Sequence, residues 1–155
     1  MRAGQETLMK RRMISAIILF LITFIALLVF VGLYIDESRR TQEAYNTQYV
    51  TNLTHVSEDV GSFLDAEGDK DFRYVRIISD MSSANSFAFL LDRLSEDRKK
   101  TVNELNACIM RYPEQMQEEN KLTELKTALE DIIAGLDQGY DEAQALVDSI
   151  DKQGH

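Results

Sequence analysis

The stretch 14–35 constrains this sequence more than any other part, because it holds 22 residues without a charge. Sixteen of them are Ile, Leu, Phe or Val. As a helix the stretch is about 33 Å long, which is enough to cross a hydrocarbon core of about 30 Å. Lipid offers no hydrogen-bond partner to peptide groups, so a crossing segment must be helical. The sequence therefore predicts a transmembrane helix over 14–35.

A cleaved signal peptide is the alternative interpretation of an apolar run near the N-terminus. The apolar region of a signal peptide spans about 7–15 residues and precedes a pair of small residues at the cleavage site. This run is longer, and residues 30–34 contain no such pair. We therefore expect an uncleaved signal anchor. The sequence has no second run of comparable length, so we expect a single crossing.

Basic residues are more frequent before this stretch than just after it. Four Lys and Arg residues precede it, and two follow closely, Arg39 and Arg40. By the positive-inside rule, residues 1–13 form a cytoplasmic basic leader and residues 36–155 an extracytoplasmic domain. The inverted orientation is the alternative, because long domains can translocate regardless of flanking charge.

The region 36–155 has the pattern of amphipathic helices, because its apolar residues recur at steps of three or four. Gly68 suits a helix end, and Asp69 and Ser95 suit the caps of two following helices. Pro113 ends the helix that precedes it. These positions predict four helices, at about 36–67, 70–94, 96–112 and 114–151.

Two features leave the arrangement of these helices open. Gly135 and Gly139 lie inside the last predicted helix and indicate either close helix approach or a local bend around Asp137. The apolar residues also keep their helical spacing across Ser95. One unbroken helix is therefore an alternative to the two predicted helices 70–94 and 96–112, which are separated by a break at Ser95. With the break we expect an all-α fold, in which the transmembrane helix continues into an antiparallel, up-down-up-down four-helix bundle. Without it we expect a three-helix arrangement.

Four features of this layout are shared with a known family. A basic leader with Lys10, Arg11 and Arg12 precedes the span, the span runs directly into the first helix, a turn lies near Gly68, and the last helix carries residues 140–146. The layout resembles the extracytoplasmic four-helix-bundle sensor domains of bacterial chemoreceptors and sensor kinases. The resemblance implies a bundle that binds a small ligand. Such receptors continue into a second span and a signalling module, which this sequence lacks, so we expect no signalling output of its own and transfer no ligand residues.

The region after the span is acidic. Residues 36–155 hold 13 Lys and Arg against 25 Asp and Glu, a net charge of −12. This balance argues against nucleic acid or an anionic membrane surface as a partner. Cys108 is the only cysteine, so no internal disulfide can form. It either packs as a small apolar side chain or forms an intermolecular bridge in an oxidising compartment.

No catalytic or metal-binding constellation stands out. His55 and His155 have no nucleophile or acid at a recognisable spacing, so we expect neither an enzyme nor a cofactor. An acidic turn consists of Asp65, Glu67, Asp69 and Asp71. It lacks the ligand order, the central Gly and the closing Glu of an EF-hand loop. We therefore interpret it as helix caps and a solvated turn, and expect no metal site.

A polar interruption in the second predicted helix is the best candidate for a ligand site. Ser82, Asn85 and Ser86 interrupt its apolar stripe, and a polar cavity between helices is where bundles hold small ligands. Tight helix packing with exposed serines is the alternative. Arg73 and Arg76 could hold a ligand carboxylate or pair with acids on neighbouring helices.

Three functions fit these observations. The first is a single-pass, membrane-anchored, extracytoplasmic module that binds a protein partner as an accessory part of an envelope complex. The second is a small-ligand-binding, sensor-like bundle without its own signalling output. The third is a structural, oligomerising coiled-coil spacer that self-associates through the apolar stripe of helix 122–150.

Overall fold

The computed structural model describes residues 3–65 and 68–152, with side chains from residue 9 onward. In these residues the protein is all-helical, which confirms the all-α part of the predicted fold, and no strand is present. The chain divides into two compact units, Met1–Thr41 (unit 1) and Gln42–His155 (unit 2). The six helices are α1 (Ala3–Leu64), α2 (Lys70–Leu90), α3 (Glu96–Arg111), α4 (Pro113–Met116), α5 (Glu119–Ala134) and α6 (Tyr140–Asp148).

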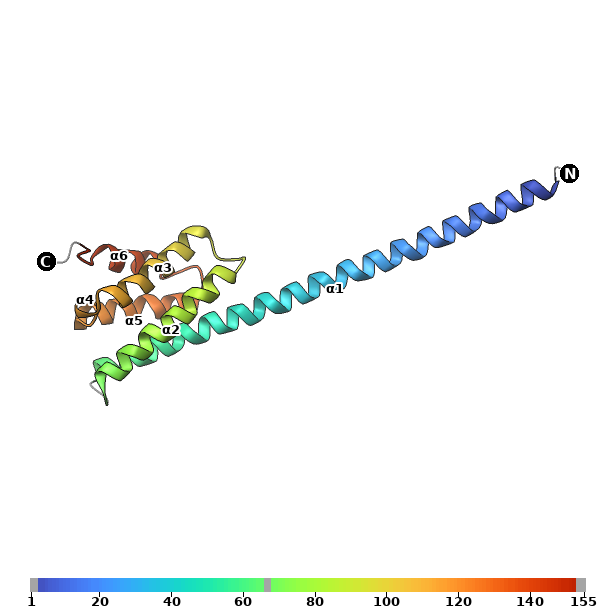
Figure 1. The fold of residues 1–155 in the computed structure, drawn as a ribbon. Coiled ribbons are helices and arrows are strands. Elements are labelled where there is room, and N and C mark those ends of the chain that lie inside the picture. The colour runs from blue at the N-terminus through green and yellow to red at the C-terminus, as the bar shows by residue number, and fades with distance from the viewer. Residues whose placement is uncertain (1–2, 66–67, 153–155) are drawn as a thin grey trace. The chain divides into compact units, whose positions relative to one another are not determined.

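Helix α1 is continuous from Ala3 to Leu64 (Figure 1). By length and composition it contains a stretch that is apolar enough to cross a membrane, and none of that stretch is buried. The large apolar side chains between Ile14 and Ile35 are all exposed. The predicted helix end at residue 67, together with Glu67 and His155, lies outside the described residues.

The turn between α1 and α2 has the residues that such a turn requires. Gly68 has a φ of 70°, a backbone conformation that glycine adopts without strain. The Asp69 carboxylate accepts hydrogen bonds from the backbone N–H groups of Asp71 (3.0 Å) and Phe72 (3.2 Å). It therefore caps α2, which begins at Lys70 as predicted.

A break separates α2 from α3. Helix α2 ends at Leu90, four residues before the predicted end, and Leu91 adopts an extended conformation. The Ser95 hydroxyl accepts a hydrogen bond from the Arg98 backbone N–H at 3.4 Å and caps α3. Leu91 and Leu94 are buried although they lie outside a helix. The apolar residues that continue the helical spacing across the break are therefore buried side chains of the connecting loop.

The prediction of one helix over 114–151 is wrong. Glu118 is extended between α4 and α5, with φ −62° and ψ 136°. Between α5 and α6, Gly135 is extended and Gly139 has a φ of 81°, which an α-helix cannot contain. The bend around Asp137 that the two glycines indicated is therefore a full change of direction between two helices.

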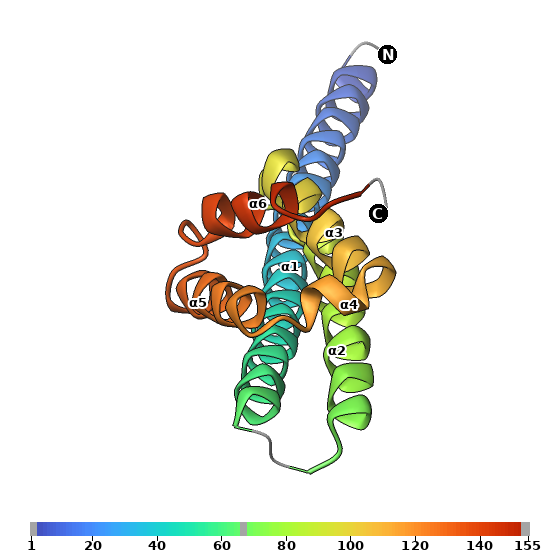
Figure 2. The same ribbon diagram turned by 90° about the vertical axis from the view of Figure 1, so that its left-hand side faces the viewer.

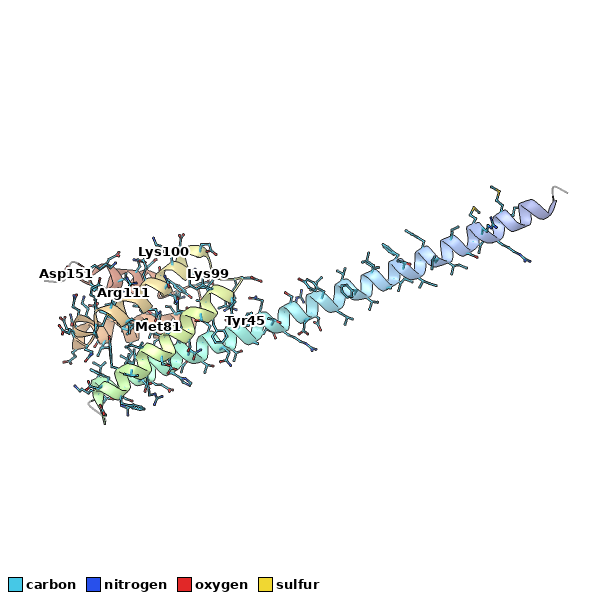
Figure 3. All side chains as sticks on the ribbon, in the orientation of Figure 1. Tyr45, Met81, Lys99, Lys100, Arg111 and Asp151 are labelled. Carbon is cyan, nitrogen blue, oxygen red and sulfur yellow. The ribbon has the colours of Figure 1, made fainter. Side chains whose placement is uncertain are left out.

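Within unit 2, α3 packs against α2 and α6, and α5 packs against α6 (Figure 2). The part of α1 in unit 2 contributes an apolar face that includes Tyr49, Leu53 and Val56. Met81 of α2 is fully buried (Figure 3). The apolar stripe proposed as an oligomerisation seam also belongs to this core, through Leu122, Leu125, Leu129, Ile132, Tyr140, Ala143, Val147 and Ile150. That stripe is therefore not exposed for a second copy of the chain.

Candidate functional site

The three polar residues of α2 that sequence reasoning singled out lie beside α3. The Ser82 hydroxyl donates to Asn106 Oδ1 at 3.1 Å, and Asn85 Nδ2 donates to Asn103 Oδ1 at 3.1 Å. The Ser86 hydroxyl bonds the backbone carbonyl of Ser82 at 3.0 Å. The first two contacts join α2 to α3, and the third lies within α2. Asn85 Oδ1 is buried and accepts no hydrogen bond from the residues that the structure describes.

The two arginines singled out on α2 are paired within the protein. Asp59 of α1 is only 3% exposed, and its two carboxylate oxygens meet Arg73 Nη1 at 3.4 Å and Arg76 Nε at 3.0 Å. The structure therefore brings Arg73 and Arg76 together with an acid of a neighbouring helix, and not with Ser82 or Asn85.

Other candidate groups have structural surroundings. Cys108 is buried, and burial raises the pKa of its thiol. Because both effects suppress thiolate chemistry, Cys108 packs as a small apolar side chain. Among the described residues, no three His, Cys, Asp or Glu side chains are grouped so that they could hold a metal ion.

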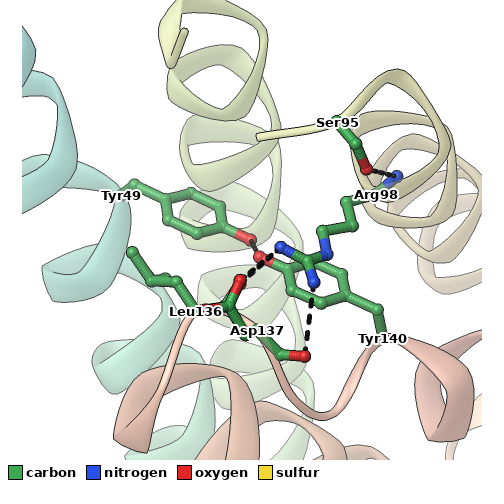
Figure 4. Close-up of polar contacts among 6 residues, drawn as sticks. All are labelled: Tyr49, Ser95, Arg98, Leu136, Asp137 and Tyr140. Atoms are coloured by element: carbon green, nitrogen blue, oxygen red, sulfur yellow. Dashed lines mark hydrogen bonds and ion pairs between the residues drawn. The ribbon is translucent and has the colours of Figure 1, made fainter. Parts of the chain in front are cut away.

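Arg98 joins the start of α3 to the loop between α5 and α6 (Figure 4). Its guanidinium donates to the Asp137 carboxylate at 2.6 Å and to the Leu136 backbone carbonyl at 3.2 Å. It also lies over the Tyr140 ring, 5.2 Å from the ring centroid. Arg98 thereby fixes a loop that has no regular hydrogen-bond ladder of its own.

A pocket of about 490 Å³ adjoins this arginine. Its walls come from α3, α5, α6 and the α5–α6 loop, and its charged lining residues are Asp97, Arg98, Asp131, Asp137, Asp141 and Glu142. Five acids against one arginine give the pocket a negative potential that attracts cations.

A buried pair of tyrosines lies beneath this arginine. The hydroxyls of Tyr49 on α1 and Tyr140 on α6 are 3.2 Å apart (Figure 4), and that of Tyr74 donates to the Ile109 carbonyl at 2.9 Å. Burial is the main cause that raises the pKa of all three tyrosines, and the neighbouring Tyr140 raises the pKa of Tyr49 further.

These shifts predict that unit 2 loses stability in alkali. Above the ordinary tyrosine pKa of 10.0 the unfolded chain loses protons that the folded protein retains, so the free energy of unfolding falls as pH rises. Between pH 10 and its own raised pKa, each such tyrosine contributes up to about 1.4 kcal/mol per pH unit, and below pH 10 the three contribute no pH dependence. Urea titrations at increasing pH should give a shallower fall for Tyr49→Phe than for the unchanged protein. Parallel curves would contradict this origin of the alkaline instability.

One face of α2 is exposed and carries most of the large exposed apolar side chains of unit 2. We call it the α2 ridge; it consists of Phe72, Val75, Ser79, Ser82, Ser83, Ser86, Phe89 and Leu90. Each of these residues lies three or four positions from another member of the set, on the side of α2 opposite its buried face. Phe72 is 61% exposed, Val75 62% and Phe89 51%. Met110 of α3 lies beside the ridge, with its sulfur 3.9 Å from the Ser82 hydroxyl.

Sequence reasoning missed both the contacts of Arg98 with Leu136, Asp137 and Tyr140 and the α2 ridge. Gly135 and Gly139 on either side of Asp137 pointed to a bend, but only the fold brings Arg98 to it. Sequence reasoning missed the ridge because Val75, when steps of three are counted, fits the same apolar stripe as the buried residues of α2. A step count cannot decide which of two adjacent stripes faces the core.

Comparison with known proteins finds no matching family model, no matching curated protein and no matching solved structure.

Proposed function

We propose that this protein is a single-pass membrane protein with unit 2 outside the cytoplasm, and that unit 2 binds a protein partner as an accessory module of an envelope complex. The α2 ridge is the observation that carries the binding role. Apolar surface in contact with water costs about 25 cal/mol per Å², and the ridge exposes two apolar pairs, Phe72 with Val75 and Phe89 with Leu90, one toward each end of α2. The apolar stretch of α1 supports the membrane anchor, and the basic residues that precede it support the orientation.

Reporter fusions test the orientation. An alkaline phosphatase fused after His155 should be active, because this reporter folds only outside the cytoplasm, and a fluorescent protein that folds only inside should stay dark. The matched control replaces Lys10, Arg11 and Arg12 with serine and places lysines at Asp36 and Glu37, which should reverse both readouts. A dark phosphatase and a bright fluorescent fusion in the unchanged protein would overturn the proposed orientation.

Photocrosslinking in membranes tests the binding role. A photoreactive amino acid at Val75 or Phe89 should give a discrete crosslinked protein, because both side chains are exposed on the ridge. The same probe at Thr51, on an exposed polar face of α1 within unit 2, is the matched control and should give none. Absence of a product from both ridge positions, or equal products from all three, would contradict a binding role for the ridge.

A second candidate function is that of a small-ligand-binding bundle of the kind found in bacterial sensor domains, without its own signalling output. The pocket beside Arg98 favours it, because its volume of about 490 Å³ lies within the range of small-molecule sites. Its acidic lining would select an organic cation. Small amines should then raise the thermal stability of the protein, whereas a module that acts only through the α2 ridge should show no such increase.

A further inference from the structure

We propose that Lys10, Arg11 and Arg12 bind the phosphate groups of anionic phospholipids in the leaflet at the N-terminal end of the apolar stretch of α1. This inference rests on the membrane anchor of the proposed function and adds a lipid class to it. The feature that carries it is the difference in charge between the two ends of that stretch.

The three basic residues lie at the depth of the lipid headgroups. Arg12 precedes Ile14 by two residues and Lys10 precedes it by four, which is about 3 Å and 6 Å along the helix axis. A bilayer of about 40–45 Å with a hydrocarbon core of about 30 Å has a headgroup layer of roughly 5–7.5 Å on each side. With Ile14 at the edge of the core, all three residues therefore leave the helix inside the layer that holds the phosphates.

The three cations are spread around the helix and have no partner of their own. Successive residues of an α-helix are about 100° apart, so Lys10, Arg11 and Arg12 span about 200° of the circumference. Met9 and Met13 occupy the remaining side, and all five residues are exposed. None of the three cations forms an ion pair with a residue whose side chain the structure describes. Their charges are therefore available to lipid phosphates on more than half of the helix circumference.

Only one acid in the leader opposes these cations. Glu6 is the sole Asp or Glu of residues 1–13, and it precedes Lys10 by four residues, a spacing at which glutamate and lysine pair on a helix. Even with that pair formed, Arg11 and Arg12 keep two positive charges. A guanidinium donates two parallel hydrogen bonds to a phosphate, so these two arginines carry the main part of the proposed contact.

The opposite end of the apolar stretch has no excess of positive charge. Asp36 and Glu37 directly follow Ile35, and they balance the charges of Arg39 and Arg40. Arg40 also pairs with Asp36, with 3.8 Å between Nη2 and Oδ2. Each uncompensated Lys or Arg next to an anionic leaflet favours the bound state about fivefold. A preference for anionic lipid is therefore expected at the start of the stretch and not at its end.

Fluorescence quenching by brominated lipids tests this inference in the full chain. The sequence contains no tryptophan, so Met13→Trp places a single reporter one residue before the apolar stretch. The protein is reconstituted in vesicles of phosphatidylcholine with about one-fifth phosphatidylglycerol, and bromine is placed on the acyl chains of one lipid or the other. Per molecule, brominated phosphatidylglycerol should quench at least about twofold more than brominated phosphatidylcholine. Equal quenching would overturn the proposed lipid contact.

Tyr34→Trp is the matched control for position. It places the reporter one residue before the other end of the stretch, and Tyr34 is exposed as Met13 is. Here the two brominated lipids should quench equally per molecule, because the neighbouring charges balance. A preference of the same size at both ends would overturn the assignment to the three basic residues.

Two double substitutions separate the arginines of the leader from other causes. With Met13→Trp as the readout, Arg11→Gln together with Arg12→Gln should lower the quenching ratio to about one. Arg39→Gln together with Arg40→Gln should leave the ratio unchanged. Glutamine favours helix about as well as arginine does, so neither pair should break α1. A ratio that survives the first pair, or falls equally with the second, would contradict the proposed contact.

The same measurement separates this inference from the proposed function. If neither brominated lipid quenches the reporter at position 13 or at position 34, the stretch does not lie in the bilayer and the membrane anchor itself is wrong. If both lipids quench equally at both positions, the anchor holds and only the contact with anionic lipid is wrong.

Discussion

Replacing Gly139 with alanine should lower the free energy of unfolding of unit 2 by about 3 kcal/mol. The backbone at Gly139 has a φ of 81°, which costs free energy for any residue with a Cβ. A Cβ there would also collide with the Ala128 carbonyl oxygen and lie 2.8 Å from Ile132 Cγ1. Both atoms belong to α5, so α5 and α6 would have to separate. A urea titration followed by circular dichroism in mild detergent measures the loss.

Gly135→Ala is the matched control for this result. Gly135 lies in the same loop, its φ of −161° is ordinary extended backbone, and a Cβ there has nothing within 4 Å. We expect a change within about 0.5 kcal/mol. Equal losses for the two glycines would show that the loop tolerates no side chain at all, and would contradict the close approach at Gly139 as the cause.

Asp59→Ala should cost about 2–3 kcal/mol, because it removes a buried carboxylate shared by two guanidinium groups. Arg73 and Arg76 would both lose this contact, and the side chain of Arg73 is only 24% exposed. The figure lies below that for a fully buried pair because Arg76 is about half exposed and water compensates part of its loss. The same urea titration gives the difference.

Arg76→Ala provides the comparison for this cluster. It leaves Asp59 with its contact to Arg73 and removes a guanidinium that water already solvates in part, so we expect a cost below about 1 kcal/mol. If Asp59→Ala costs no more than Arg76→Ala, the buried carboxylate does not hold the α1–α2 hairpin together.

Local features of the fold could be predicted from the sequence because single residues determine them. Gly68, Asp69 and Ser95 each supply a backbone conformation or a cap, and the structure places turns and helix starts where they occur. The break in the last predicted helix could not be predicted, because its apolar stripe continues at helical spacing across Gly135 and Gly139. The residues of that stripe are buried whether or not the helix is continuous, so burial alone carries no information about the break.

The candidate sites were harder to predict than the fold, because each depends on contacts between distant segments. Arg98 lies near its own cap residue in the sequence, but its partner Asp137 is 39 residues away. Nothing local to Arg98 distinguishes it from the other arginines. For Arg73 and Arg76, the acidic excess of the chain favoured internal pairing, and the pairing with Asp59 follows from that excess.

The contact between Tyr49 and Tyr140 has a consequence for how the chain acquires its structure during synthesis. The two residues are 91 positions apart, and a ribosome needs roughly 5–20 s to add that many residues. For this interval the nascent chain exposes the side of α1 that later contacts α6. Pairing of α1 with α2, or a chaperone, must cover that surface until translation reaches the last helix.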